Sequence, residues 1–108
     1  MKILLDENID VRFRTRLSDA HEVYTVKDMG WTGVKNGELL KLLGQNSFDC
    51  WIVVDKNIPY QQNIEMLPCL VVVMDVFRNT LAHLDALLPT LLLKLDMPGN
   101  ERLIIVGE

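Results

Sequence analysis

Short apolar runs along this chain stop abruptly on polar residues, and these runs predict a set of buried strands. Three of them, "KILL", "WIVV" and "LVVVM", cover residues 2–5, 51–54 and 70–74 without alternating apolar and polar positions. Strands of this kind are usually covered by helices on both faces, as in parallel sheets. Residues 22–26 and 102–106 predict two further strands.

Helical spacing of apolar residues fills the segments between these strands. Apolar residues spaced by four predict a helix over residues 9–17. Residues 38–43 predict a second helix, with Asn36 as its N-cap and Gly44 at its end. Residues 81–95 predict a third, bent or split at its internal proline. Alternating strands and helices predict an α/β domain of three layers, with a mainly parallel central sheet of about four to five strands.

Length and charge narrow the class of protein. The 108 residues suit one domain with one core, spanning residues 1–108. The net charge of −4 excludes a broad basic surface for nucleic acid, so binding of RNA would depend on a local patch. We see no secretory signal and no apolar stretch long enough to span a bilayer. We therefore expect a cytoplasmic protein that makes no contact with a membrane.

Aspartates stand where the three apolar strands end. Asp6, Asp55 and Asp75 each follow such a run, and the first two repeat an Asp-x-Asn pattern in "LLDEN" and "VVDKN". The carboxyl ends of parallel strands lie at one edge of a sheet, and ligands of open α/β sheets bind just beyond that edge. We therefore expect the three carboxylates to meet there.

Carboxylates that converge repel one another unless they bind a cation or share protons. Oxygen ligands with few histidines favour Mg²⁺ or Mn²⁺ over zinc. Glu38 is a fourth candidate ligand, and Asn8 and Asn57 can orient the ligand oxygens. An aspartate after a strand is also a common turn former, which is the preferred interpretation of Asp75 alone. A glutamate in the first turn of a helix can also simply favour the helix dipole.

Other polar residues are candidates for contacts with a substrate. Arg12 and Arg16 share a predicted helix face and can hold a phosphate, or they can form salt bridges with Asp10 or Asp19. The "PYQQN" segment places an aromatic beside three amides, which can stack on a base or cap a short helix. The predicted substrate-binding residues are Asn8, Arg12, Arg16, Lys56, Asn57, Gln61, Gln62 and Asn63.

Three segments in order, "MKILLDENID", "HEVYTVKDMGWTGVKNGELLKLL" and "WIVVDKNIPYQQN", resemble the PIN-like family of toxin nucleases related to VapC toxins. The resemblance runs from Met1 to about Asn63 and continues weakly to the last strand. It implies a Rossmannoid PIN-like fold and a ribonuclease that depends on Mg²⁺ or Mn²⁺. It also implies a small antitoxin protein as partner.

The resemblance carries the catalytic acids onto Asp6, Asp55 and the helix acid Glu38. The same three residues, together with Asp75, form the expected set of metal ligands. The chain departs from many relatives at Asn36 and Asn57, where they have Asp, and at Val53, where they have Thr. These changes leave fewer acidic ligands for a metal.

Two alternatives remain beside the nuclease. A PIN-like module without activity would only bind its partner, and a homodimer is a further possible assembly. A receiver domain of a response regulator also has an acid pair after its first strand and a phosphoacceptor aspartate after its third, with proline four residues on, as in Asp55 and Pro59. Receivers resemble one another in a Lys-Pro after the fifth strand, however, and "LIIVGE" has none. The sequence therefore favours the PIN-like interpretation.

Overall fold

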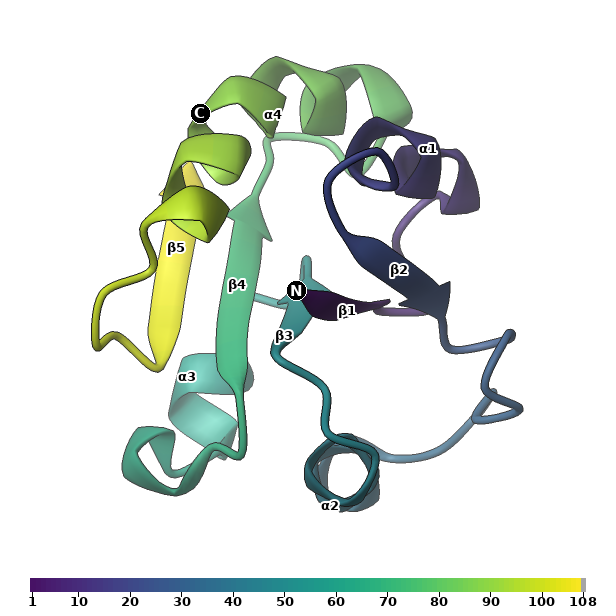
Figure 1. Ribbon diagram of the computed structural model, residues 1–108, viewed down its shortest axis with the longest axis vertical. Coiled ribbons are helices and arrows are strands. Elements are labelled where there is room, and N and C mark those ends of the chain that lie inside the picture. Colours follow the sequence, from purple (N-terminus) through teal and green to yellow (C-terminus); the bar gives the residue numbers. More distant parts are fainter. Residues whose placement is uncertain (108) are drawn as a thin grey trace.

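The computed structural model describes residues 1–107, apart from the side chains of Pro59 and Tyr60. Its centre is a five-stranded sheet in the order β2-β1-β3-β4-β5, and every neighbouring pair is parallel (Figure 1). This architecture confirms the expected three-layer α/β fold. The strands are β1 (Lys2–Leu5), β2 (Glu22–Thr25), β3 (Cys50–Val53), β4 (Leu70–Asp75) and β5 (Leu103–Gly107).

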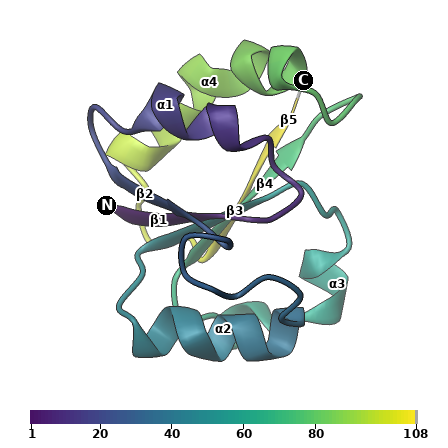
Figure 2. The same cartoon turned by 90° about the vertical axis from the view of Figure 1, so that its right-hand side faces the viewer.

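Helices cover both faces of the sheet. Figure 2 shows α1 and α4 above the sheet and α2 and α3 below it. The helical elements are the 3₁₀ helix η1 (Val11–Phe13), α1 (Arg14–Leu17), α2 (Asn36–Gln45), α3 (Ile58–Gln61), the 3₁₀ helix η2 (Ile64–Met66) and α4 (Leu81–Asp96). No helix in the described part of the chain is both long and apolar enough to cross a membrane.

The sheet separates two apolar layers. Successive residues of a strand point to opposite faces, so Ile3 and Leu5 pack with α1 and α4, while Leu4 packs with α2. All four residues of β3 are buried. The continuous apolar runs in the sequence therefore arise because each central strand supplies both layers.

Some boundaries differ from those expected. The helix expected over residues 9–17 is a 3₁₀ turn followed by a short α-helix, because the side chain of Asp10 caps the turn by accepting the N–H of Arg12. Helix α2 begins at Asn36 itself and continues through Gly44. Helix α4 passes through Pro89 as one helix, with that proline on its exposed side.

The connection from β4 to β5 has the opposite hand to the three connections before it. The chain crosses from β2 to β3 and from β3 to β4 on the α2 face, moving towards β5. The connection from β4 to β5 moves one strand further in the same direction, but its helix α4 lies on the α1 face (Figure 2). Moving in the same direction on the opposite face reverses the hand of the crossover. Such connections are nearly always of one hand, so this crossover is unusual. One consequence is that Ile105, on the α2 face of β5, is 57% exposed.

Candidate functional site

The two Asp-x-Asn segments lie at the same edge of the sheet, on neighbouring strands. Asp6 follows β1, and its backbone N–H donates to the carbonyl of Ile52 in β3 at 3.0 Å. Asp55 lies two residues beyond the end of β3. In a sheet of this strand order the direction of the chain reverses between β1 and β3, which is where doubly wound folds bind their ligands. The expected meeting of these two strand ends is therefore present.

Both segments fold into the same kind of turn. The Asp55 carboxylate accepts the backbone N–H of Asn57 at 2.9 Å, and the Asp55 carbonyl accepts the N–H of Ile58 at 3.4 Å. The Asp6 carbonyl likewise accepts the N–H of Ile9 at 3.0 Å. Aspartate is favoured in such turns because its side chain bonds the backbone two residues on.

The residue that ends each turn is an isoleucine buried in the core. Ile9 packs into the layer between the sheet and α1 and α4. Ile58 packs into the opposite layer, beneath α2. The repeated sequence is thus Asp-x-Asn-Ile, and it sends the chain from the sheet edge to one face in the first case and to the other face in the second. This structural role explains part of the repetition without any ligand.

The charge on Asp6 is in an unfavourable environment. Partial burial is the main cause that raises the pKa of Asp6, and the negative charges of Glu7 and Asp55 raise it further. Backbone N–H groups of Asn8 and Glu7 act in the opposite direction. The side-chain amide of Asn8 also lies 3.4 Å from the Asp6 carboxylate. A cation between the two aspartates would relieve the repulsion.

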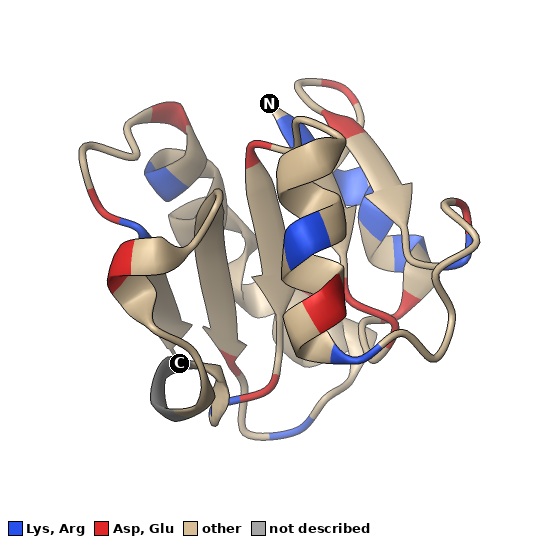
Figure 3. Ribbon diagram, turned by 90° about the horizontal axis from the view of Figure 1, so that it is seen from below, with Lys and Arg blue, Asp and Glu red and all other residues tan. Residues whose placement is uncertain are grey.

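Asp75 is the last residue of β4, and its carboxylate already has a partner. The ammonium of Lys56 lies 2.7 Å from Asp75, with the two side chains 59% and 44% exposed. The pair stands beside a cavity of about 280 Å³, which is lined by Lys56, Asn57, Val73, Asp75 and Ile105. Figure 3, in which the strand arrows point downward, shows acidic positions at their carboxyl ends. Asp75 thus reaches the expected edge but is neutralised there by a lysine.

Glu38 lies in the first turn of α2, as expected, and is exposed. Its side chain makes no hydrogen bond or ion pair with any other described residue. Within residues 1–107, no three histidine, cysteine, aspartate or glutamate side chains form a group that could hold a metal ion. Among the carboxylates at this edge, Asp6 and Asp55 are a pair whose negative charges act on one another. Two carboxylates are a common protein contribution to a Mg²⁺ site, because water and substrate phosphates complete the coordination.

The predicted arginines are held by carboxylates. Arg12 forms an ion pair with Asp10 at 2.6 Å. Arg16 forms one with Asp85, which joins α1 to α4. Both pairs are at the surface, so either guanidinium can exchange its partner for a phosphate at little cost.

A third arginine was not predicted as a site residue. Arg14 lies 2.5 Å from Asp28, whose carboxylate also accepts the backbone N–H of Thr25 at the end of β2. The backbone N–H of Asp28 in turn donates to the Thr25 hydroxyl. These bonds hold the loop after β2 against α1. The Thr-x-x-Asp spacing was the sequence signal for this reciprocal pair.

The amides of the "PYQQN" segment have mixed roles. Asn63 accepts the backbone N–H of Glu65 at 3.1 Å and so caps η2. Gln61 is exposed and Gln62 is half-buried. The expected aromatic contact falls on the Tyr60 side chain, outside the described part of the chain.

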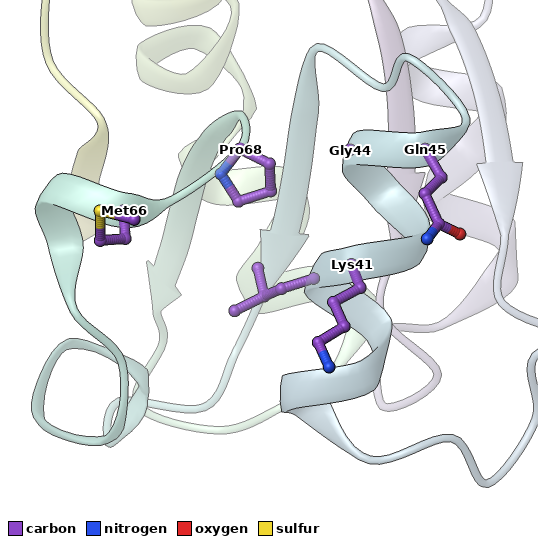
Figure 4. A pocket seen from close by; sticks show the side chains of 6 residues that line it. Lys41, Gly44, Gln45, Met66 and Pro68 are labelled. Carbon is purple, nitrogen blue, oxygen red and sulfur yellow. The ribbon is translucent and has the colours of Figure 1, made fainter.

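A larger cavity of about 390 Å³ lies on the α2 face of the sheet. Figure 4 shows it between the C-terminal half of α2 and the segment before β4, with Lys41, Gln45, Met66 and Pro68 around it. Gly44 packs tightly here, because a Cβ at that position would lie 3.2 Å from the Cβ of Pro68 and one of the two would have to shift by a few tenths of an ångström. The close packing of α2 therefore explains a glycine that was expected to end the helix.

Comparison of the chain with known protein families, with curated proteins and with solved structures gives no match.

Proposed function

We propose that this protein is a ribonuclease that depends on Mg²⁺ or Mn²⁺, with Asp6 and Asp55 as the residues that hold the metal. The observation that supports this proposal is the position of the two aspartates on either side of the β1–β3 reversal. Their like charges lie at a place where α/β folds bind ligands, and a bound cation would offset the repulsion between them.

The surrounding residues have defined tasks in this proposal. A bound divalent ion would activate water and neutralise charge on the phosphate. The Asn8 amide orients the Asp6 carboxylate through its 3.4 Å contact. Lys56 can turn from Asp75 to a phosphate, and Asn57 lines the adjoining cavity together with Asp75. Glu38, exposed in the first turn of α2, is the proposed further acid of this edge.

The wider expectations follow from the resemblance to the PIN-like toxin family. They are a cytoplasmic location, a small antitoxin protein as partner and RNA as substrate. Arg12, Arg16, Gln61, Gln62 and Asn63 are the proposed further contacts with RNA. A module of the same family that binds its partner without cleaving RNA is the nearest alternative.

One structural observation favours a second candidate function. The strand order 2-1-3-4-5 is that of flavodoxin-like folds, which include receiver domains. Asp6, Glu7 and Asp55 then correspond to an acid pair and a phosphoacceptor. The reversed hand of the last crossover argues against this function.

A cleavage assay tests the proposal. Unstructured RNA is incubated with the protein in Mn²⁺, and acetyl phosphate is supplied separately in Mg²⁺. We expect cleavage that EDTA abolishes and that Asp6→Asn and Asp55→Asn each reduce by more than about 100-fold. Asp19→Asn, which changes an exposed aspartate on another part of the surface, is the matched control and should cleave as the parent does.

Three results would separate the alternatives. RNA binding without cleavage in either metal indicates the inactive module. A phosphoryl group on Asp55 after treatment with acetyl phosphate indicates the receiver-like function. Cleavage that survives both substitutions would mean that the catalytic residues lie elsewhere.

A further inference from the structure

We propose that the outer edge of β5 pairs with β5 of a second copy of this chain, in antiparallel orientation, to form a continuous sheet of two protomers. The inference concerns assembly and does not depend on the proposed nuclease activity.

The backbone of β5 offers a free row of hydrogen-bonding groups. The carbonyl of Arg102 accepts the N–H of Val71 in β4 at 2.9 Å. In a parallel ladder the backbone groups of successive residues point alternately to the two sides of the strand. Ile104 and Val106 therefore face β4 with their N–H and C=O groups, while those of Leu103, Ile105 and Gly107 point away from the sheet. No strand among the described residues lies on that side.

The two outermost strands of the sheet, β2 and β5, differ in how they are protected from pairing with another strand. Edge strands that must stay single usually carry charges, prolines or bulges. The other edge strand, β2, has four residues and begins with the exposed Glu22. The five residues of β5, "LIIVG", include neither a charge nor a proline. The edge of β5 therefore has the composition of a pairing surface.

The sequence of β5 is complementary to itself in one register. If Ile105 lies opposite Ile105 of the second copy, then Leu103 lies opposite Gly107, and Ile104 opposite Val106. All three outward-facing residues then form hydrogen-bonded pairs with their counterparts. The glycine leaves space for the leucine that faces it. No like charges oppose each other within the paired strands, so a second copy fits this edge.

The surface next to β5 is also apolar. Ile105 is 57% exposed, although isoleucine at a strand centre is normally covered. Leu93 and Met97, four residues apart at the end of α4, are 70% and 83% exposed. Figure 1 shows the C-terminal half of α4 beside β5. A two-fold axis perpendicular to the sheet places the two copies of Ile105 together on the α2 face. It also keeps both copies of α4 on the opposite face, where Leu93 and Met97 of one copy can pack against the other copy.

Sedimentation velocity of the full chain over a range of concentrations tests this assembly. We expect the parent to sediment as a dimer at micromolar concentration. Ile105→Lys places two ammonium groups opposite each other at the two-fold axis and should raise the dimer dissociation constant by more than about tenfold. Val11→Lys is the matched control, because Val11 is 59% exposed and lies on η1. It should remain as dimeric as the parent.

A second variant distinguishes loss of the dimer from loss of folding. Ile105→Pro removes an N–H that points away from β4, so it should abolish dimers while circular dichroism shows a folded monomer. A parent that remains monomeric up to millimolar concentration would overturn the proposal. It would also be overturned by dimers that tolerate both changes at Ile105, or by dimers that Val11→Lys disrupts equally.

Discussion

The turns at Asp6 and Asp55 have the same local sequence pattern and the same backbone hydrogen bond from the isoleucine three residues on, but their electrostatic environments differ. In the first turn the residue after the aspartate is Glu7, which adds a like charge and helps to raise the pKa of Asp6. In the second turn the corresponding residue is Lys56, whose ammonium is bound by Asp75. The shared geometry is sufficient to explain two aspartates as turn formers. It does not explain why one of them is kept in a place that disfavours its charge.

Some features of the two Asp-x-Asn-Ile turns are explained by folding alone, and one feature is not. The backbone hydrogen bonds that Ile9 and Ile58 donate, and the burial of these two isoleucines, belong to the fold. The unfavourable charge on Asp6, next to Asp55, is the part that turn formation leaves unexplained. Strain of this kind is typical of functional sites, where a ligand relieves it.

The largest predicted effect tests whether the two turns are equivalent as anchors. Ile9→Ala and Ile58→Ala each remove a buried side chain from one of the two layers. Each should lower the free energy of unfolding by about 2–5 kcal/mol, as measured by urea denaturation. Ile64→Ala, at a position 40% exposed, is the control and should cost about 0.5 kcal/mol or less. A small effect at only one of the two anchors would show that the turns are not equivalent.

A smaller effect distinguishes the charges. The pKa of Asp6 is raised in the folded protein, so protonated Asp6 contributes to folding stability below its ordinary pKa of 3.8. This contribution is lost as the pH rises through the pKa that Asp6 has in the folded protein. Asp6→Asn should therefore raise the melting temperature of the metal-free protein at pH 7, and this gain should disappear below pH 3.8.

Asp28 provides a control of opposite sign. Hydrogen bonds from Thr25, followed by the charge of Arg14, lower the pKa of Asp28. Its stabilisation is therefore present above pH 3.8 and is lost as pH falls through the folded pKa. Asp28→Asn should lower the melting temperature at pH 7. If Asp6→Asn has the same destabilising sign as Asp28→Asn, Asp6 is an ordinary turn residue.

The smallest predicted effect concerns the ion pair in the second turn. Lys56 and Asp75 are both more than one-third exposed, so solvent screens their attraction. A double-mutant cycle with Lys56→Gln and Asp75→Asn should give a coupling energy of about 1 kcal/mol or less in chemical denaturation. A larger coupling would mean that Lys56 is a fixed part of the fold and not available to a phosphate.

The sequence was sufficient to predict the sheet because its three central strands are continuous apolar runs. Residues 2–5 were predicted with the boundaries that β1 has, and the edge where the aspartates lie followed from parallel strands. The short helix α3 was not among the predicted helices, since four residues around a proline give no helical periodicity. The reversed crossover before β5 was not predictable from periodicity, because the apolar stripe of α4 does not specify which face of the sheet it covers.

The candidate site was predicted only in part. The adjacency of the Asp6 and Asp55 strand ends followed from their pattern. The partner of Asp75 did not, because Lys56 reaches it from a different strand end. The ion pairs of Arg12 and Arg16 depend on side-chain directions, which sequence spacing leaves open: Asp10 was among the expected partners, and Asp85 was not.

The proposed cation site of Asp6 and Asp55 is tested by melting curves recorded in EDTA and in Mn²⁺. A ligand that binds only the folded state stabilises it by RT ln(1 + [L]/Kd). The parent should melt at a higher temperature in Mn²⁺ than in EDTA, and Asp6→Asn and Asp55→Asn should each lose most of that increase while remaining folded without metal. A parent whose melting temperature is the same in Mn²⁺ and in EDTA would contradict the shared site.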